Sequence, residues 1–113
     1  MISHTQEILS KAKELERLSR ESSRKLVEEG LSITFIPKEQ LFAYNIKSIV
    51  ETVEALVRNE PKERLVIRFK KDIPDAYLNL KKVEETTHGK NNLAALKKIR
   101  ETIKFIEENY SKI

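Results

Sequence analysis

The stretch RLVIRFKKDIPDAYLNL, residues 64–80, decides the fold of this chain. Its opening residues alternate as those of a β-strand would, but the alternation covers only residues 65–69. A helical spacing of three and four residues continues much further, over residues 66–87 and straight across Pro74. It is formed by Val66, Phe69, Ile73, Ala76, Leu80, Val83 and Thr87. The longer pattern favours a helix that faces a core.

Pro74 lies in the middle of this helical pattern. A proline lacks the amide hydrogen and disfavours helical geometry in the residue before it. Asp72, just upstream, is a good residue for capping a new helix start. We therefore expect residues 61–88 to form two helical pieces nearly in line, bent or interrupted near residues 72–74.

The same spacing recurs in other segments. It is formed in residues 42–56 by Phe42, Ile46, Ile49, Val53 and Leu56, and in residues 96–113 by Leu96, Ile99, Ile103, Ile106, Tyr110 and Ile113. The first segment is weaker, with Ile8, Ala12, Leu15, Ser19, Ser22 and Leu26. Its small and polar members predict thin packing, which suits a close helix approach, a loosely docked arm or exchange between subunits.

Glycine and proline mark the boundaries between helices. Gly30 and Gly89 can end a helix in the left-handed conformation, whereas Pro37 and Pro61 are tolerated at a helix start. The expected helices cover about residues 4–29, 38–59, 61–88 and 91–112. The segment LSITFIP, residues 31–37, is expected to be an extended connector without a partner strand.

Short connections between helices of this length favour antiparallel neighbours. The sequence therefore predicts an all-α, antiparallel four-helix bundle that forms a single domain over residues 1–113.

Composition supports one compact domain and narrows the function classes. The 113 residues are 39% hydrophobic and 35% charged, with 2 Gly and no Cys, so a disulfide framework and a cysteine metal site are excluded. The net charge of +4 permits an anionic partner without requiring one. The opening residues MISHTQEILSKAKEL lack the apolar core of a signal peptide, and no apolar run reaches the roughly 18 residues of a membrane span. We expect a soluble, cytoplasmic protein that does not enter a membrane.

Signals for catalysis are scarce. Two glycines cannot build a glycine-rich phosphate loop, and the serines of SRESS, residues 19–23, have no histidine near them in the sequence. Glu85 and His88 have the Glu-x-x-His spacing of di-iron bundles, but such a site needs a second copy and further inward glutamates. We expect no catalytic residues, no metal and no cofactor. An enzyme whose site is completed by another subunit is the third alternative.

Basic residues follow outward positions of the third and fourth expected helices. The candidates for binding an anion or a nucleic acid are Arg64, Arg68, Lys71, Lys81, Lys82, Lys90, Lys97 and Lys104. If the two faces adjoin, they form one cationic strip of the kind that binds the phosphate backbone of a nucleic acid. A nucleic-acid-binding module is therefore the alternative interpretation.

Three large apolar residues fall where the bundle core does not need them. Leu78, Phe105 and Tyr44 are expected on outward positions, and such residues can mark a partner surface when they gather in space. The favoured function is a non-catalytic bundle that binds a protein partner as an adaptor, inhibitor or regulator, with self-association into a dimer as one form of this binding.

Overall fold

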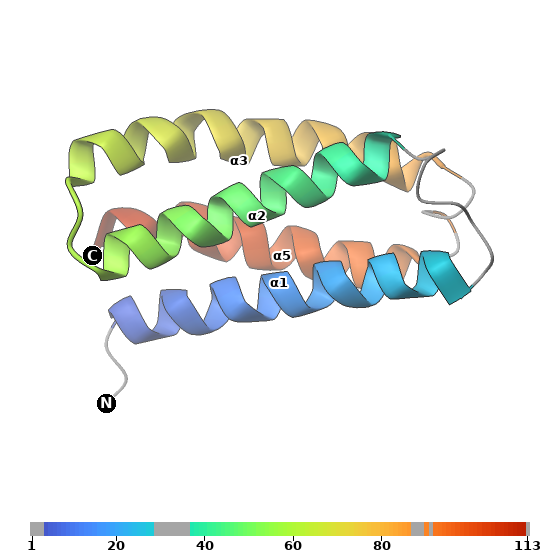
Figure 1. Ribbon diagram of the computed structural model, residues 1–113, viewed down its shortest axis with the longest axis horizontal. Helices are drawn as coiled ribbons and strands as arrows, with labels where there is room; N and C mark the ends of the chain where they lie inside the picture. The colour runs from blue at the N-terminus through green and yellow to red at the C-terminus, as the bar shows by residue number, and fades with distance from the viewer. Residues whose placement is uncertain (1–3, 29–36, 87–89, 91, 113) are drawn as a thin grey trace.

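The described residues fold into an assembly dominated by four long helices. The computed structural model describes residues 4–28, 37–86, 90 and 92–112. The helices are α1 (His4–Glu28), α2 (Pro37–Val57), α3 (Lys62–Glu84) and α5 (Leu93–Asn109), and a 3₁₀ turn, η2 (Tyr110–Lys112), follows α5 (Figure 1). No strand occurs in these described ranges, so the prediction of an all-α four-helix fold is confirmed.

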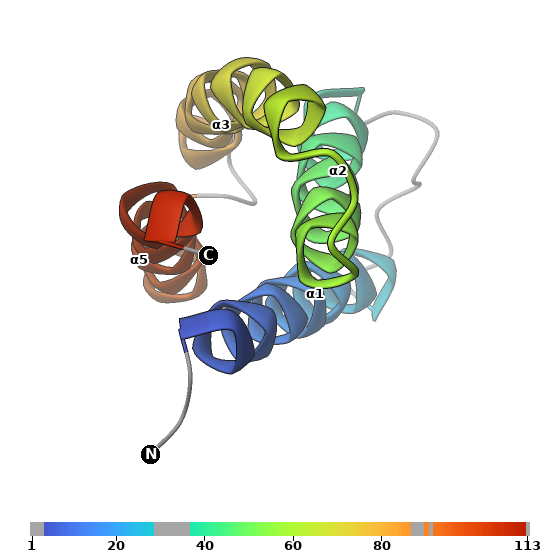
Figure 2. The same ribbon diagram turned by 90° about the vertical axis from the view of Figure 1, so that its left-hand side faces the viewer.

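The helices form a ring in which each contacts two neighbours. α1 packs against α2 and α5, and α3 packs against α2 and α5. Neighbouring helices run in opposite directions, and the view along the bundle shows the four of them around a common core (Figure 2). The α2/α3 interface is the most extensive and the α3/α5 interface the thinnest.

The predicted helical spacing identifies most of the core. All five residues predicted for the second helix are buried, as are four of those predicted for the last helix, from Leu96 to Ile106. Two core positions differ by one residue from the prediction. Leu65 is buried in place of Val66, and Leu18 in place of Ser19. Burying a large aliphatic or aromatic side chain contributes about 1.5–3 kcal/mol, so this shared core holds the four helices together.

Helix α3 is continuous through Pro74, and the expected interruption near residues 72–74 is not found. A bend at this proline is not confirmed either. Asp72 does not cap a second helix, because its carboxylate instead accepts a hydrogen bond from the Ser48 hydroxyl at 2.5 Å. Pro74 lies on the exposed side of α3, while Ile73 and Ala76 are buried in the core. Core packing on both sides of the proline therefore offsets its local cost.

The α2/α3 connection is a tight turn built on Asn59. This residue has a φ of 62°, the left-handed conformation that asparagine tolerates better than most residues. Its amide donates to the Leu56 carbonyl at 3.1 Å, and the Glu60 amide donates to the Ala55 carbonyl at 3.2 Å. These bonds satisfy the last carbonyls of α2 and reverse the chain into α3.

Some sequence predictions fall on undescribed residues. The expected connector at residues 31–37 lies outside the described residues except for Pro37, which begins α2. Gly30, His88 and Gly89 also lie outside them. Within the described ranges, no helix has the length and apolar character that crossing a membrane requires.

Candidate interaction surface on α2 and α3

Large hydrophobic side chains are exposed mainly on two neighbouring helices. In the described part of the chain, five are at least half exposed: Leu41, Tyr44, Ile67, Leu78 and Leu93. The first two lie on α2, the next two on α3, and Leu93 lies alone at the start of α5. Exposure is highest, at 70%, for Tyr44 and Ile67.

A buried hydrogen bond fixes the register that brings the α2 and α3 residues together. The Asn79 side-chain Nδ2 donates to Asn45 Oδ1 at 2.5 Å, so these two residues face each other across the interface. Tyr44 and Leu78 each precede one member of this pair. Since the helices are antiparallel, the preceding residues point to the same outer side of the helix pair.

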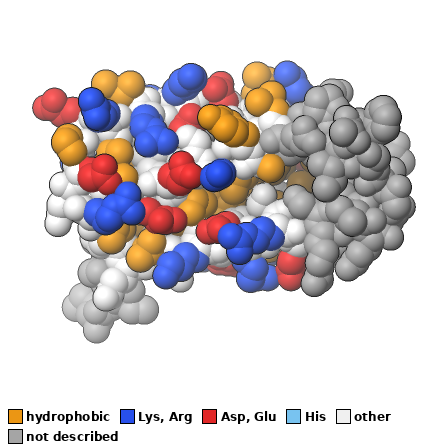
Figure 3. Space-filling model, in the orientation of Figure 1, with side chains coloured by type: hydrophobic (Ala, Val, Ile, Leu, Met, Phe, Trp, Pro, Cys, Tyr) orange, Lys and Arg blue, Asp and Glu red, His pale blue; other side chains and the backbone are white. Residues whose placement is uncertain are grey.

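A second line of apolar residues continues along the outer face of α3. Ile67, Lys71, Pro74 and Leu78 are separated by four, three and four residues, which places them on one helical face. Ile67 and Leu78 are about 16 Å apart along the axis at 1.5 Å per residue. Figure 3 shows hydrophobic side chains interspersed with Lys and Arg, and also with Asp and Glu, on the face that α2 and α3 present.

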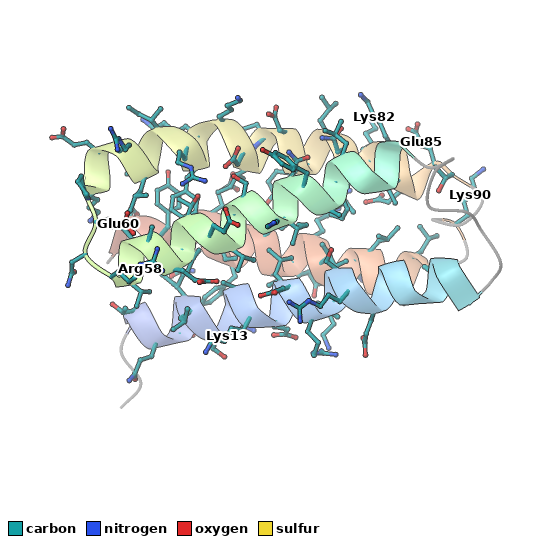
Figure 4. The ribbon with its side chains drawn as sticks, viewed as in Figure 1. Lys13, Arg58, Glu60, Lys82, Glu85 and Lys90 are labelled. Carbon is teal, nitrogen blue, oxygen red and sulfur yellow. The ribbon has the colours of Figure 1, made fainter. Side chains whose placement is uncertain are left out.

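We call this region the α2/α3 surface. Its apolar members are Leu41, Tyr44, Ile67, Pro74 and Leu78, and its cations are Arg64, Arg68, Lys71 and Lys82. Arg68 donates to the Ser48 hydroxyl at 3.4 Å, which fixes it on the side of α3 that faces α2. Lys82 projects from the far end of α3 (Figure 4).

All eight predicted cations are exposed, but they do not form one strip. Lys81 follows Tyr77 by four residues and precedes Glu84 by three, and both of these face α5. Lys81 therefore lies on the opposite edge of α3 from Arg68. Between α3 and α5, the Arg100 guanidinium donates to Glu84, which places a neutralised pair where the strip was expected to cross.

The cations of α5 form a separate group. Lys97 and Lys104 lie on its outer side, and Lys104 is within 4.0 Å of Glu108. Lys90 lies beyond the end of α3, away from both groups (Figure 4). The structure therefore places four of the predicted candidates on the α2/α3 surface and two on the outer side of α5, while Lys81 and Lys90 belong to neither group.

The cations of α3 differ from those of α1 in their pairing. In the ranges that the structure describes, Arg64, Lys71, Lys81 and Lys82 have no carboxylate within ion-pair distance. On α1, by contrast, three cations are paired within the helix: Lys11 with Glu14, Arg17 with Glu21, and Arg20 with Glu16. The positive charge of these four α3 side chains is thus left for solvent or a partner.

Phe105 is not part of an exposed surface, so its predicted outward position is wrong. Its ring is half-buried and packs against the core at the α1/α5 interface. The Lys11 ammonium lies 5.5 Å from the ring centroid in a cation–π contact, and Lys98 pairs with Glu14 at 3.7 Å nearby. Helix α1 thereby covers the face of α5 that the sequence pattern left open.

A concave region lies between α1 and α2. It has a volume of about 530 Å³, with Ala43, Ile46 and Val50 as its apolar members. Its other lining residues are Glu16, Ser19, Arg20, Lys47, Glu51 and Glu54. The charges there are mixed in sign, and Glu16 and Arg20 already pair with each other.

The Tyr77 hydroxyl of α3, which faces Glu107 of α5, has a raised pKa. Burial raises the pKa of Tyr77 to about 12, and the neighbouring Glu107 carboxylate adds to this effect. A tyrosine with this pKa is a hydrogen-bond donor and not a base at neutral pH. In the described residues, no group of three or more His, Cys, Asp or Glu side chains is arranged to hold a metal ion.

Comparisons with known proteins give no relative: no family model, curated protein or solved structure matches the chain.

Sequence reasoning missed three apolar members of the α2/α3 surface, Leu41, Ile67 and Pro74. Ile67 fits the alternating pattern of a strand, which drew attention away from its position on a helix. The sequence did contain a signal, because Ile67, Lys71, Pro74 and Leu78 follow one another at helical spacing and so share one face of the helix. Leu41 offers no such local signal, since its membership depends on α3 lying beside α2.

Proposed function

We propose that this protein is a non-catalytic binding module that docks a protein partner on its α2/α3 surface, acting as an adaptor, inhibitor or regulator in the cytoplasm. One observation carries the proposal: four of the five strongly exposed large hydrophobic residues in the described ranges lie on this surface. A few residues supply most of the binding free energy at protein interfaces, and tyrosine and arginine, present on this surface as Tyr44, Arg64 and Arg68, are enriched among them.

The α2/α3 surface has apolar area that a partner can bury. Tyr44 and Leu78 are 70% and 55% exposed, so both have most of their side-chain area left to bury. Each square ångström of apolar area removed from water contributes about 25 cal/mol. Neighbouring cations add orientation and a faster association rate with an oppositely charged partner.

The proposal can be tested by site-specific photo-crosslinking of the full chain. Tyr44 is replaced by a photoreactive phenylalanine analogue, an aromatic replacement at an exposed position, and the protein is irradiated in extract from its source cells. The same analogue at Lys13, on the outer side of α1, is the control (Figure 4). We expect a discrete adduct from position 44 and none of that mass from position 13.

A matched pair of variants shows whether an adduct depends on the surface. Leu78→Glu and Leu93→Glu introduce the same charge at residues that are 55% and 52% exposed, on different parts of the bundle. We expect Leu78→Glu to abolish the adduct and Leu93→Glu to preserve it, with the helical circular dichroism signal unchanged in both. An adduct that survives Leu78→Glu, or no adduct at position 44, contradicts the proposal.

Nucleic-acid binding is the second candidate function. It is favoured by the exposure of all eight predicted cations and by the lack of ion pairs at Arg64, Lys71, Lys81 and Lys82 within the described residues. Titration of a random duplex and a single strand at two salt concentrations tests it. Affinity that falls steeply with salt supports this function, because phosphate contacts release counterions, and no binding at low salt removes it.

A further inference from the structure

We propose that the partner of the α2/α3 surface is an acidic amphipathic helix. This inference rests on the proposed function and specifies the chemistry of the partner. It follows from three features of the surface: the elongated arrangement of its apolar residues, the unpaired cations beside them, and the repulsion that a second copy of the chain would meet there.

The apolar residues form a shape that suits a docked helix. Ile67, Pro74 and Leu78 follow one line on α3, about 16 Å long at 1.5 Å per residue, or roughly three helical turns. Tyr44 and Leu41 lie across the α2/α3 interface near the Leu78 end of this line. A helix with apolar residues at positions i, i+3 or i+4, i+7 and i+11 presents a stripe of the same length.

The charge beside this line selects an acidic partner. Arg64, Lys71 and Lys82 have no ion-pair partner in the described residues. Asp72 of α3 is turned toward α2, where it accepts a hydrogen bond from the Ser48 hydroxyl. Carboxylates on the edges of a docked helix would meet these cations at the partly desolvated rim of an interface.

A second copy of the chain fits the same surface poorly. In a two-fold symmetric dimer, this patch would face its own copy, so Arg64, Lys71 and Lys82 would meet the same cations of the other protomer. Like charges placed together at an interface oppose association. The repulsion therefore favours a different partner over self-association through the α2/α3 surface.

A nucleic acid also fits the surface less well. Phosphates would use the cations, but Leu41, Ile67 and Leu78 are aliphatic and offer no aromatic face for base stacking. Tyr44 is the one aromatic residue among the members of the surface defined above. An occupant that buries the aliphatic side chains as well as pairing the cations uses all of this surface.

The proposal can be tested with two synthetic peptides of about 18 residues, or five helical turns. Both carry leucines at the same amphipathic spacing, and the polar positions are glutamates in one and lysines in the other. Binding to the full chain is measured by fluorescence titration, and the contacted residues are mapped by NMR chemical shifts. We expect the glutamate peptide to bind at least about tenfold more tightly, with shifts at Tyr44 and Leu78.

Charge-reversal variants identify the cations responsible. The double variant Arg64→Glu with Lys71→Glu should reduce the affinity for the glutamate peptide about tenfold or more, and Lys13→Glu on α1 should leave it unchanged. Equal binding of both peptides, shifts confined to the concave region between α1 and α2, or unchanged affinity in the double variant would overturn the proposal.

The crosslinking experiment separates failure of this inference from failure of the proposed function. If neither peptide binds while the Tyr44 adduct with a different protein persists, a partner surface exists and the acidic helix is wrong. An adduct with twice the mass of the chain assigns the surface to a second copy and overturns the acidic helix. A duplex that binds and shifts the same residues, with no peptide binding, assigns the surface to a nucleic acid instead.

Discussion

The Asn45–Asn79 hydrogen bond should behave as one energetic unit that couples α2 to α3. The two side chains are only 7% and 6% exposed, and Nδ2 of Asn79 donates to Oδ1 of Asn45 at 2.5 Å. Asn79→Ala removes the donor and leaves a buried acceptor without its partner. The expected loss in the free energy of unfolding is about 1–3 kcal/mol, because an unsatisfied buried group loses its hydration without compensation.

A double-mutant cycle isolates the interaction between the two asparagines. Asn45→Ala alone should cost a similar amount, but it should cost less when Asn79→Ala is already present, because the partner has gone. We expect a coupling free energy of about 1 kcal/mol, within the range measured for side chains in direct contact. In a chain of this size, each 1 kcal/mol lowers the melting temperature by about 4 °C.

Urea unfolding followed by circular dichroism measures this coupling in the wild type and three variants. The slope of the unfolding free energy with urea concentration should be the same in all four proteins, so that a shift in the unfolding midpoint reports a change in stability alone. The exposed Arg17–Glu21 pair, at 3.2 Å, provides a control cycle with an expected coupling of about 0.3 kcal/mol. If the asparagine cycle gives no more coupling than this control, the pair is not desolvated as the structure indicates and the argument fails.

Three further changes probe the bundle. Pro74→Ala should raise the free energy of unfolding by about 2 kcal/mol. Proline costs about 3 kcal/mol in a helix interior, and up to about 1 kcal/mol of this is offset because proline restricts the unfolded chain. A lower free energy of unfolding, measured in urea, would contradict this. Tyr77→Phe should reduce the loss of folding stability at alkaline pH. Folding raises the pKa of Tyr77 from 10.0 to about 12, so its contribution to stability is complete below pH 10.0 and is lost as the pH rises toward about 12. Parallel curves of unfolding free energy against pH for the wild type and Tyr77→Phe would show that Tyr77 is not the source of the alkaline loss of stability. Phe69→Ala should cost about 3–5 kcal/mol, because the ring is fully buried and stacks on Tyr110 with centroids 4.4 Å apart; a cost below about 1 kcal/mol would show that the site collapses around the cavity.

The fold was predictable where burial follows from local periodicity. Residues from Phe42 to Leu56 all occupy the core as the spacing predicts, because a helix that buries one face must repeat apolar residues on that face. Pro74 was harder to interpret, since its local chemistry favours an interruption. The outcome depends on Ile73 and Ala76, whose packing against other helices keeps α3 continuous.

The candidate surface was predictable only in part, because exposure depends on neighbouring helices. Tyr44 and Leu78 lie outward on their own helices, and no described neighbour covers them. Phe105 has a similar position on its helix, yet α1 packs beside it and Lys11 lies over its ring. The sequence pattern of one helix does not specify which of its edges a neighbour will cover.

The position of Arg64 at the start of α3 is unfavourable for the isolated bundle, which is an argument for a partner. Arg64 and Arg68 are four residues apart, and like charges at this spacing destabilise a helix by about 0.2–0.5 kcal/mol, whereas the opposite charges on α1 at the same spacing form pairs. Arg64 also lies in the first turn of α3, where the helix dipole disfavours a cation. Arg64→Glu should therefore stabilise the free protein in urea while weakening its binding to the glutamate peptide. Such opposed effects on stability and binding are expected of a residue that contributes to a complex and not to the stability of the fold. A variant that lost both stability and binding would instead indicate a structural role for Arg64.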